Sequence, residues 1–402
     1  MVAKDTLTHQ VRLSSAYYKI LRDMFDRLDV KVSDNYNALY GRDDLLKVLM
    51  CMSDGNRFAA SATASLGLAS ACVGADGADG GRVPSSSWVL KKLRDVDPEH
   101  MEKWCRDGTR RLLKAAKIKR MLRRGGMVAV DLTNIAYYGR SLKEETVKSK
   151  PKNGTSRFLV HAVAHSIGHG YDVPLESIRV TKEDKMDTIL LRILKNLDRA
   201  GARPGLLLVD RGFFSVNCIN GLKRAGHKFL MPAVKNRRVK KAILEHHDGR
   251  RRAASMFHIS NSDGERAGFN LLIVEKEKQD KDAAITDRYV AFATNMPCRT
   301  REELVETLPE TYRRRWIIET GFRVIKDVLG KTCNNALHVR LFLFHFALLL
   351  YNLWLLAKHE DIRRGRYAGG ESFTIALFVQ RLMSTDKKLI DWEKEHGNYY
   401  DA

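Results

Sequence analysis

The chain is 402 residues long, which is too long for one ordinary domain and predicts two or three domains. It carries 70 Lys and Arg against 48 Asp and Glu, a formal net charge of +22, so an anionic partner is expected, and nucleic acid is the common one. A basic protein without such a partner is the alternative. The six cysteines include no Cys-x-x-Cys pair, which argues against a zinc ribbon or a disulfide framework and favours a reducing cytoplasm.

The first part of the chain, residues 1–124, is predicted to be helical. Apolar residues have helical spacing over 13–28, 43–52 and 58–66, and a Pro-Ser-Ser-Ser segment precedes another helix that extends to Val96. A short helix, a turn and a capped helix predict a helix-turn-helix-like unit, with a plain helical bundle as the alternative. The basic stretch 110–124 contacts a nucleic-acid backbone in one interpretation and forms a solvated helix face in the other.

From residue 125 the pattern changes to apolar strands that alternate with helices. Two segments repeat one pattern, an apolar strand that ends in an aspartate, at residues 126–131 and 205–210. Further strands are expected at 157–164, 178–181 and 229–233, and helices at 186–200 and 216–225. This alternation predicts an α/β fold with a mixed sheet flanked by helices.

Residues 235–298 are predicted to form a β-rich insertion, with a basic run followed by three strands, at 256–260, 268–275 and 289–293. Helices resume at Arg301 and are expected over 310–329, 337–358 and 372–383. The segment 341–357 is nearly all apolar, but it contains a histidine and an asparagine and is shorter than the roughly 20 residues of a membrane span. A buried core helix is therefore expected there, and no membrane association.

The two strand-end aspartates, Asp131 and Asp210, are the first candidate functional residues. A carboxylate at the carboxyl end of a buried strand faces the crevice in which open α/β sheets bind ligands. Two such carboxylates on neighbouring strands form a hard, anionic oxygen site that suits Mg²⁺ or Mn²⁺. For either aspartate alone, a turn or capping role is the alternative, and the repeated pattern favours the metal site.

A third candidate carboxylate, Glu319, lies in a segment with helical spacing. Tyr312, Arg315, Glu319 and Lys326 are separated by three, four and seven residues and fall on one face of a continuous helix. An adjacent apolar stripe can anchor that helix to a core. A carboxylate flanked by Arg and Lys indicates a metal ligand beside cations that hold phosphates.

These residues resemble a known family, the DDE transposases of prokaryotic insertion sequences. The relevant group has its third acid in a Tyr-x2-Arg-x3-Glu-x6-Lys signature, which Tyr312, Arg315, Glu319 and Lys326 match at every position. Asp131 and Asp210 resemble the first and second acids of the family. The resemblance covers about residues 125–357, and the helical N-terminus more weakly.

The resemblance implies an RNase H-like catalytic core interrupted by a β-rich insertion, behind an all-helical DNA-binding region. The expected division of the chain follows from it. It comprises a DNA-end-binding region at 1–124, the first part of the core at 125–234, the insertion at 235–298, the second part of the core at 299–358 and a C-terminal helical tail at 359–402.

The resemblance also implies the chemistry, the partners and the location. Asp131, Asp210 and Glu319 are the expected catalytic residues and the ligands of two Mg²⁺ (or Mn²⁺) ions, and Tyr312, Arg315 and Lys326 are expected to bind DNA phosphates. The expected partners are double-stranded DNA, as the terminal inverted repeats and the target, and a second copy of the chain in a synaptic complex. The expected location is the cytoplasm, in association with the nucleoid.

Three alternatives were weighed against the transposase hypothesis. A transposase-derived DNA-binding protein without catalysis is disfavoured because all three acids are present, and a junction resolvase leaves the Tyr–Arg–Glu–Lys face unexplained. A tyrosine recombinase is disfavoured because His247 and Arg250 lie in a charged stretch. His161, His165 and His169 recur every four residues, which mimics a metal site, but the segment is predicted to be a strand without carboxylate partners.

Overall fold

The computed structural model describes residues 15–32, 39–73, 83–122, 125–168, 171–276, 282–297, 301–363 and 373–384. The start of the first expected helix at Leu13, the end of the basic stretch at 123–124, His169 and most of the expected tail lie outside these residues. The chain forms two compact units, one of Met1–Ile118 with Phe322–Ala402 and the other of Lys119–Gly321. We refer to them as unit 1 and unit 2. The five-part division expected from the sequence stays a prediction.

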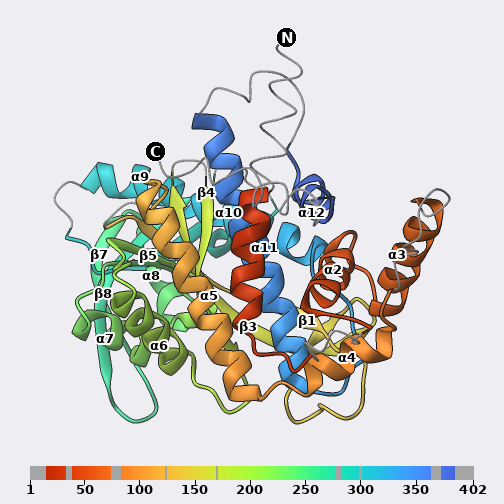
Figure 1. Cartoon of the computed structure of the whole chain (residues 1–402). Coiled ribbons are helices and arrows are strands. Elements are labelled where there is room, and N and C mark those ends of the chain that lie inside the picture. The colour runs from red at the N-terminus through yellow and green to blue at the C-terminus, as the bar shows by residue number, and fades with distance from the viewer. Residues whose placement is uncertain are drawn as a thin grey trace. The chain divides into compact units, whose positions relative to one another are not determined.

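Among the described residues, unit 2 contains a nine-stranded sheet in the order β2-β3-β1-β5-β6-β9-β8-β7, with β4 paired to β3 (Figure 1). Strand β1 is parallel to β5 and β5 to β6, and the other pairs are antiparallel. The strands are β1 (Met127–Ala136), β2 (Val147–Lys152), β3 (Thr155–Gly168), β4 (Tyr171–Val180), β5 (Leu206–Val209), β6 (Phe229–Pro232), β7 (Ala254–Ser260), β8 (Arg266–Glu275) and β9 (Tyr289–Thr294).

The pairing of β1 with β5 begins at a close approach of two glycines. The N–H of Gly205 donates to the carbonyl of Gly126 at 3.0 Å, and a Cβ at Gly205 would overlap the carbonyl oxygen of Gly125. On the other side, β2 and β3 form a hairpin whose turn contains Asn153 and Gly154, both with positive φ (55° and 77°). Such a pair of φ angles is favoured in two-residue hairpin turns, and it explains the Asn-Gly sequence.

The helices of unit 2 are α6 (Met186–Arg199), α7 (Val216–Arg224), α8 (Arg237–His247) and α9 (Arg301–Arg313). Helix α6 buries an apolar stripe and packs against β4 and α7, and α7 packs against β8. Asn236 caps α8 by accepting from the N–H of Val239 at 3.0 Å. The predicted α/β class, with a mixed sheet, flanking helices and an N-terminal helical region, is confirmed by these elements and by those of unit 1.

One predicted helix differs from the structure. Instead of a continuous helix over 310–329, α9 is followed by a 3-10 turn, η4 (Arg314–Trp316), and then by α10 (Ile317–Asp327). The carbonyl of Arg314 accepts from the N–H of Ile317, the i to i+3 pattern of the tighter helix. Arg315 is buried in this turn, whereas Trp316 is 69% exposed. The expected single face from Tyr312 to Glu319 is therefore interrupted by a turn with a different period.

The regular elements of the described part of unit 1 are helices, apart from one isolated β-bridge between Phe58 and Lys331. Its elements are a helix over 15–26, α2 (Arg42–Ser53), α3 (Ala59–Val73), α4 (Ser86–Arg94), α5 (Pro98–Ile118), α11 (Leu337–Arg363) and α12 (Ile375–Met383). Helix α11 is apolar on all sides, as expected of a core helix, and α4, α5 and α12 pack against it (Figure 1). Trp104 of α5 lies against Phe342 of α11, with ring centroids 5.4 Å apart.

Helix α11 corresponds to the segment predicted as a buried core helix. Within the described part of the chain, it is long and apolar enough to cross a membrane by length and composition alone. However, 83% of its most apolar window is buried inside the structure, and buried core helices pass the same test. Its packing against three other helices of unit 1 accounts for its apolar character.

Candidate active site

The sheet of unit 2 places the two predicted aspartates side by side. Val130 of β1 pairs with Val209 of β5 in parallel register. Asp131 directly follows Val130, and Asp210 directly follows Val209. Asp131 accepts from the N–H of Leu132 at 2.8 Å, and Asp210 accepts from the N–H of Gly212 at 3.2 Å. Two carboxylates thus lie at neighbouring positions where the β1–β5 pairing ends. Strand β1 itself continues to Ala136 because it goes on pairing with β3, so Asp131 lies within its strand and not at the strand end that the sequence predicts.

Arg315 joins the first aspartate to the predicted third acid. Its Nη1 lies 2.5 Å from Asp131 Oδ2, and its Nη2 lies 3.3 Å from Glu319 Oε1. Arg315 is 8% exposed, whereas the Glu319 side chain is 50% exposed. The structure therefore brings the three acids and Arg315 together at one edge of the sheet, with the guanidinium between two of the carboxylates.

Tyr312 contacts the same region from the last turn of α9. Its hydroxyl donates to the carbonyl of Val209 at 3.3 Å, and its ring lies 5.3 Å from that of Phe292 on β9. The Arg315 guanidinium lies over the Tyr312 ring at 5.5 Å. In this structure the tyrosine thus braces the end of β5, next to Asp210. Phosphate binding by its hydroxyl remains a prediction.

Lys326, the fourth member of the signature, lies in the last turn of α10. It is half-buried and is assigned to unit 1, whereas Glu319 belongs to unit 2. Its expected contact with DNA phosphates is likewise a prediction.

Burial and charge shift the ionisation of the two paired groups. Burial raises the pKa of Asp131 above its usual range, although the Arg315 guanidinium opposes this. Burial acts to lower the pKa of Arg315, but Tyr312 and the three carboxylates outweigh it and raise that pKa further. The guanidinium therefore remains charged, and its positive charge favours the ionised form of Asp131 against the effect of burial.

The carboxylates suit a divalent metal by their chemistry, but Arg315 separates two of them. Within the described parts of both units, no group of three or more His, Cys, Asp or Glu side chains is positioned to hold a metal ion. Hard carboxylate oxygens are nevertheless the donors that Mg²⁺ and Mn²⁺ prefer, and Asp131 and Glu319 supply such oxygens. In this structure both carboxylates are paired with Arg315.

The histidines that mimic a metal site lie on β3, as the sequence predicts for that segment. His161 Nδ1 lies 3.4 Å from Ser177 Oγ, and His165 Nδ1 lies 3.8 Å from Asp172 Oδ2, across the β3–β4 pairing. His247 Nδ1 lies 3.0 Å from the hydroxyl of Tyr289. These contacts are those of histidines held by neighbouring strands and helices.

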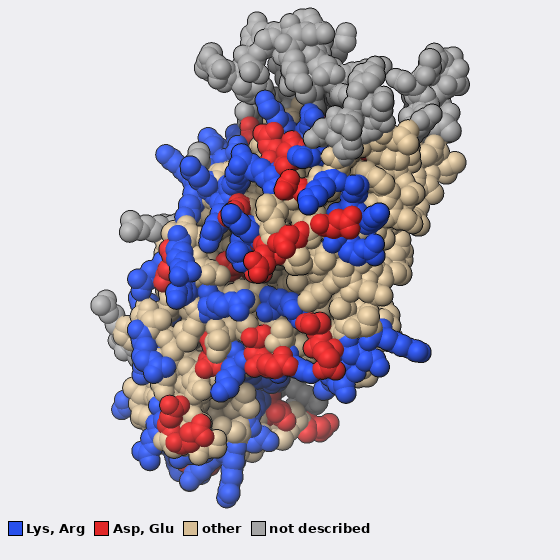
Figure 2. Space-filling view, turned by 60° about the horizontal axis from the view of Figure 1, so that its bottom comes forward, with Lys and Arg blue, Asp and Glu red and all other residues tan. Residues whose placement is uncertain are grey.

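The charge of the chain is visible on its surface. Lys and Arg side chains are spread over most of the face in Figure 2, with smaller groups of Asp and Glu among them. The positive charge of the chain is therefore divided among many separate cations on this face.

The mixed sheet, its two neighbouring aspartates and the glutamate on α10 form the arrangement expected of an RNase H-like transposase core. A family described as Transposase DDE domain matches residues 124–353, and the chain belongs to this family. The match contains Asp131, Asp210 and the whole signature from Tyr312 to Lys326. The transposase family expected from the sequence is thus confirmed.

A solved structure is similar to most of the chain. It is the cryo-EM structure of a piggyBac transposase synaptic complex with hairpin DNA, with a TM-score of 0.56 and 10% sequence identity. The similarity covers 94% of this chain and 78% of that chain. At this identity the likeness concerns the fold, and it extends beyond the family match into the helical N-terminal region. No curated protein matches the sequence.

Sequence reasoning missed the ion pairs that Arg315 makes. The signal for one of them was present, since Arg315 and Glu319 are four residues apart. The other pair joins residues 184 apart in the chain, and no local pattern indicates it.

Proposed function

We propose that this protein cleaves DNA strands at the terminal inverted repeats of an insertion sequence and joins the freed ends to target DNA. The observation that carries the proposal is the parallel register of β1 and β5, which sets Asp131 beside Asp210 within reach of Arg315 and Glu319. Double-stranded DNA is the proposed partner, a homodimer the proposed active assembly, and the nucleoid in the cytoplasm the proposed location.

Asp131, Asp210 and Glu319 would hold two Mg²⁺ (or Mn²⁺) ions. When bound, such ions activate the attacking oxygen and stabilise the leaving 3′-oxygen in an in-line displacement. Strand β1, which contains Asp131, and the end of β5, which precedes Asp210, fix the two aspartates on rigid elements, and Tyr312 holds the backbone that precedes Asp210. Glu319, on α10, is the most exposed of the three carboxylates, so an entering ion can reach it from solvent.

Arg315 has two successive roles in this proposal. In the chain alone it pairs with both Asp131 and Glu319, which limits the repulsion between these two carboxylates. Once it turns away, its planar guanidinium can form a bidentate contact with a DNA phosphate next to the scissile bond. Lys326 would neutralise a further phosphate. The first nucleophile is water, which frees a 3′-OH, and that 3′-OH then attacks a second strand.

The test is strand cleavage of a duplex that carries the terminal inverted repeats flanking this gene, with Mg²⁺ or with EDTA. Glu319→Gln is the test variant, and Glu310→Gln is the matched control, since Glu310 is an exposed glutamate of α9 paired with Arg313. Mg²⁺-dependent nicking at the repeat boundary, lost only in Glu319→Gln, is the expected result. Specific DNA binding by wild type without cleavage, even with Mn²⁺, would instead indicate a transposase-derived binding protein.

A further inference from the structure

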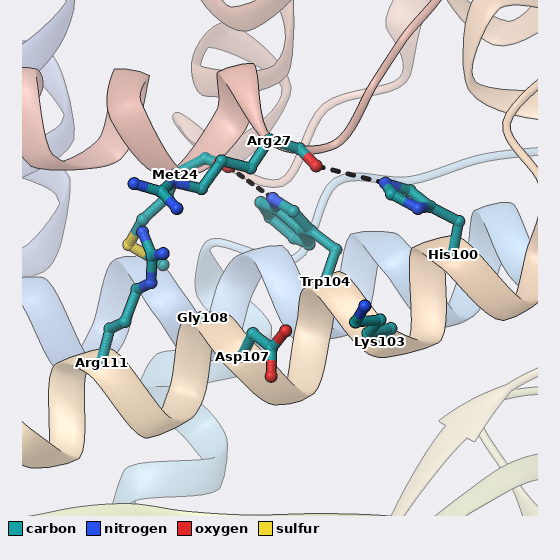
Figure 3. A pocket seen from close by; sticks show the side chains of 8 residues that line it. All are labelled: Met24, Arg27, His100, Lys103, Trp104, Asp107, Gly108 and Arg111. Atoms are coloured by element: carbon teal, nitrogen blue, oxygen red, sulfur yellow. Dashed lines mark hydrogen bonds between the residues drawn. The ribbon is translucent and has the colours of Figure 1, made fainter.

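A cavity of about 190 Å³ lies in unit 1 between α5 and the end of the helix over 15–26 (Figure 3). Six of its lining residues, spaced along one side of α5, are His100, Lys103, Trp104, Asp107, Gly108 and Arg111. The other two are Met24 and Arg27. The volume is far above the roughly 10–15 Å³ that holds one water molecule, so the cavity has room for a larger polar group.

Three cations surround this cavity. Arg27, Lys103 and Arg111 are all exposed, and none of them makes an ion pair with another described residue. Asp107 is the single acid of the lining, and it lies 3.7 Å from Arg110 outside it. The lining thus has an excess of two positive charges with His100 neutral, and its cations are available to an anion.

The walls of the cavity are held by two contacts between α5 and the segment 24–27, of which the first is buried and the second exposed. Trp104 Nε1 donates to the carbonyl of Met24 at 2.5 Å, and His100 Nε2 lies 3.2 Å from the carbonyl of Arg27 (Figure 3). A Cβ at Gly108 would lie 2.9 Å from Met24 Cε and 3.2 Å from Leu349 Cδ2. The glycine therefore lets α5 approach its neighbours closely, and the cations project from α5 and the segment 24–27, whose spacing is set by packing.

We propose that this cavity is a binding site for a backbone phosphate of double-stranded DNA. The inference rests on the proposed function, which supplies the DNA. Phosphate oxygens are the anions that Arg and Lys side chains of DNA-binding proteins contact most often, and these contacts set the position of the duplex without reading its sequence. The sequence prediction of a DNA-binding helical region thereby gains a specific site. That site centres on Lys103 and Arg111, with Arg27 contributed by the turn that follows the helix over 15–26.

The test compares two double variants of the full chain by fluorescence anisotropy of a labelled duplex over a series of NaCl concentrations. Lys103→Ala/Arg111→Ala removes two cations of the cavity. Lys19→Ala/Arg106→Ala removes the same charge from surface positions outside it, where Arg106 pairs with Glu102. In the first variant we expect affinity for DNA to fall roughly tenfold at about 0.1 M NaCl and the salt slope to fall by about one.

Further binding measurements, with a second duplex and with other variants, identify the ligand. The loss should be equal on the terminal-repeat duplex and on a scrambled duplex, because a phosphate contact carries no base information. Lys103→Arg/Arg111→Lys should retain binding, and Asp107→Asn should tighten it by roughly two- to fivefold, since a like charge is removed beside the phosphate.

Unchanged DNA affinity in Lys103→Ala/Arg111→Ala, with wild type binding normally, would overturn the cavity assignment and leave the proposed function intact. Absence of DNA binding by wild type would refute both. Calorimetric binding of inorganic phosphate that is lost in the double variant, with DNA binding unchanged, would assign the cavity to a free anion and also overturn the inference.

Discussion

The guanidinium of Arg315 donates to the carboxylate of Asp131 at 2.5 Å, in a contact that is largely shielded from solvent. Because Arg315 also contacts Glu319, one cation holds two of the three proposed metal ligands. Metal binding and this arginine therefore compete for the same carboxylate oxygens.

From this competition we expect Arg315→Ala to bind Mg²⁺ about tenfold more tightly than wild type, because the carboxylates are no longer neutralised. Without metal, the same variant should be less stable by about 3 kcal/mol, since a buried charge loses its partner. Calorimetry and thermal unfolding with and without Mg²⁺ measure both effects. Arg313→Ala, at an exposed position, is the control. Weaker Mg²⁺ binding by Arg315→Ala would contradict the expectation.

Tyr312→Phe distinguishes a bracing role from phosphate binding. The hydroxyl donates to the carbonyl of Val209, so its loss should cost about 1 kcal/mol of stability and reduce strand cleavage several-fold by loosening the backbone before Asp210. The DNA affinity of the variant, measured by anisotropy, should stay unchanged. A lower affinity with unchanged stability would favour a direct contact between the hydroxyl and a phosphate.

Gly205→Ala tests the start of the β1–β5 pairing. The added methyl group would overlap the carbonyl oxygen of Gly125, so the two strands must separate locally. We expect a loss of about 2–3 kcal/mol in the free energy of unfolding. Gly67→Ala is the control, because nothing lies within 4 Å of the added Cβ. In α3 that change should instead stabilise by up to about 1 kcal/mol, and chemical denaturation measures both. Equal stability of the two variants would argue against the close approach.

The buried His165 predicts how stability depends on pH. Burial lowers its pKa to about 3, below the roughly 6.5 of an unfolded histidine. The unfolded state therefore binds a proton first as the pH falls, and stability decreases from about pH 6.5 downward. Between pH 7 and pH 5 this histidine should account for a loss of about 2 kcal/mol.

Denaturation of His165→Gln at the two pH values measures this contribution. The loss of stability between pH 7 and pH 5 should be smaller in this variant than in wild type. His258→Gln, an exposed position on β7, should behave as wild type does. An identical loss in wild type and His165→Gln would show that His165 titrates in the folded state as it does in the unfolded state.

The sequence predicted the strands that are apolar and buried, since their pattern is local. Strand β2 was missed because its Val-Lys-Ser-Lys-Pro-Lys sequence is almost wholly exposed at the edge of the sheet and has no apolar alternation. Helix α8 was missed because its exposed residues are basic and only three of its residues are buried apolar ones. In both cases the element depends on neighbours that a local pattern does not contain.

In the candidate site, too, local patterns are predictable from the sequence, whereas contacts between distant parts of the chain are not. The apolar runs that precede Asp131 and Asp210 are visible in the sequence, and the register of β1 and β5 aligns the two aspartates. The continuation of β1 beyond Asp131 depends on its pairing with β3, which no local pattern shows. The turn at η4 could not be predicted, because the spacing of Tyr312, Arg315 and Glu319 is equally compatible with an uninterrupted helix. The inward position of Arg315 depends on Asp131, far away along the chain.

The parallel pairing of β1 with β5 also makes the distance along the chain between Asp131 and Asp210 irrelevant to their separation in space. The intervening residues form the β2–β3 hairpin, β4 and α6, and the turn at Asn153 and Gly154 lies at the outer side of that hairpin. A peptide tag or a small folded domain inserted between Asn153 and Gly154 would lengthen the chain without changing the β1–β5 register. This turn is therefore a permissive position at which the enzyme can be labelled or fused to a targeting module.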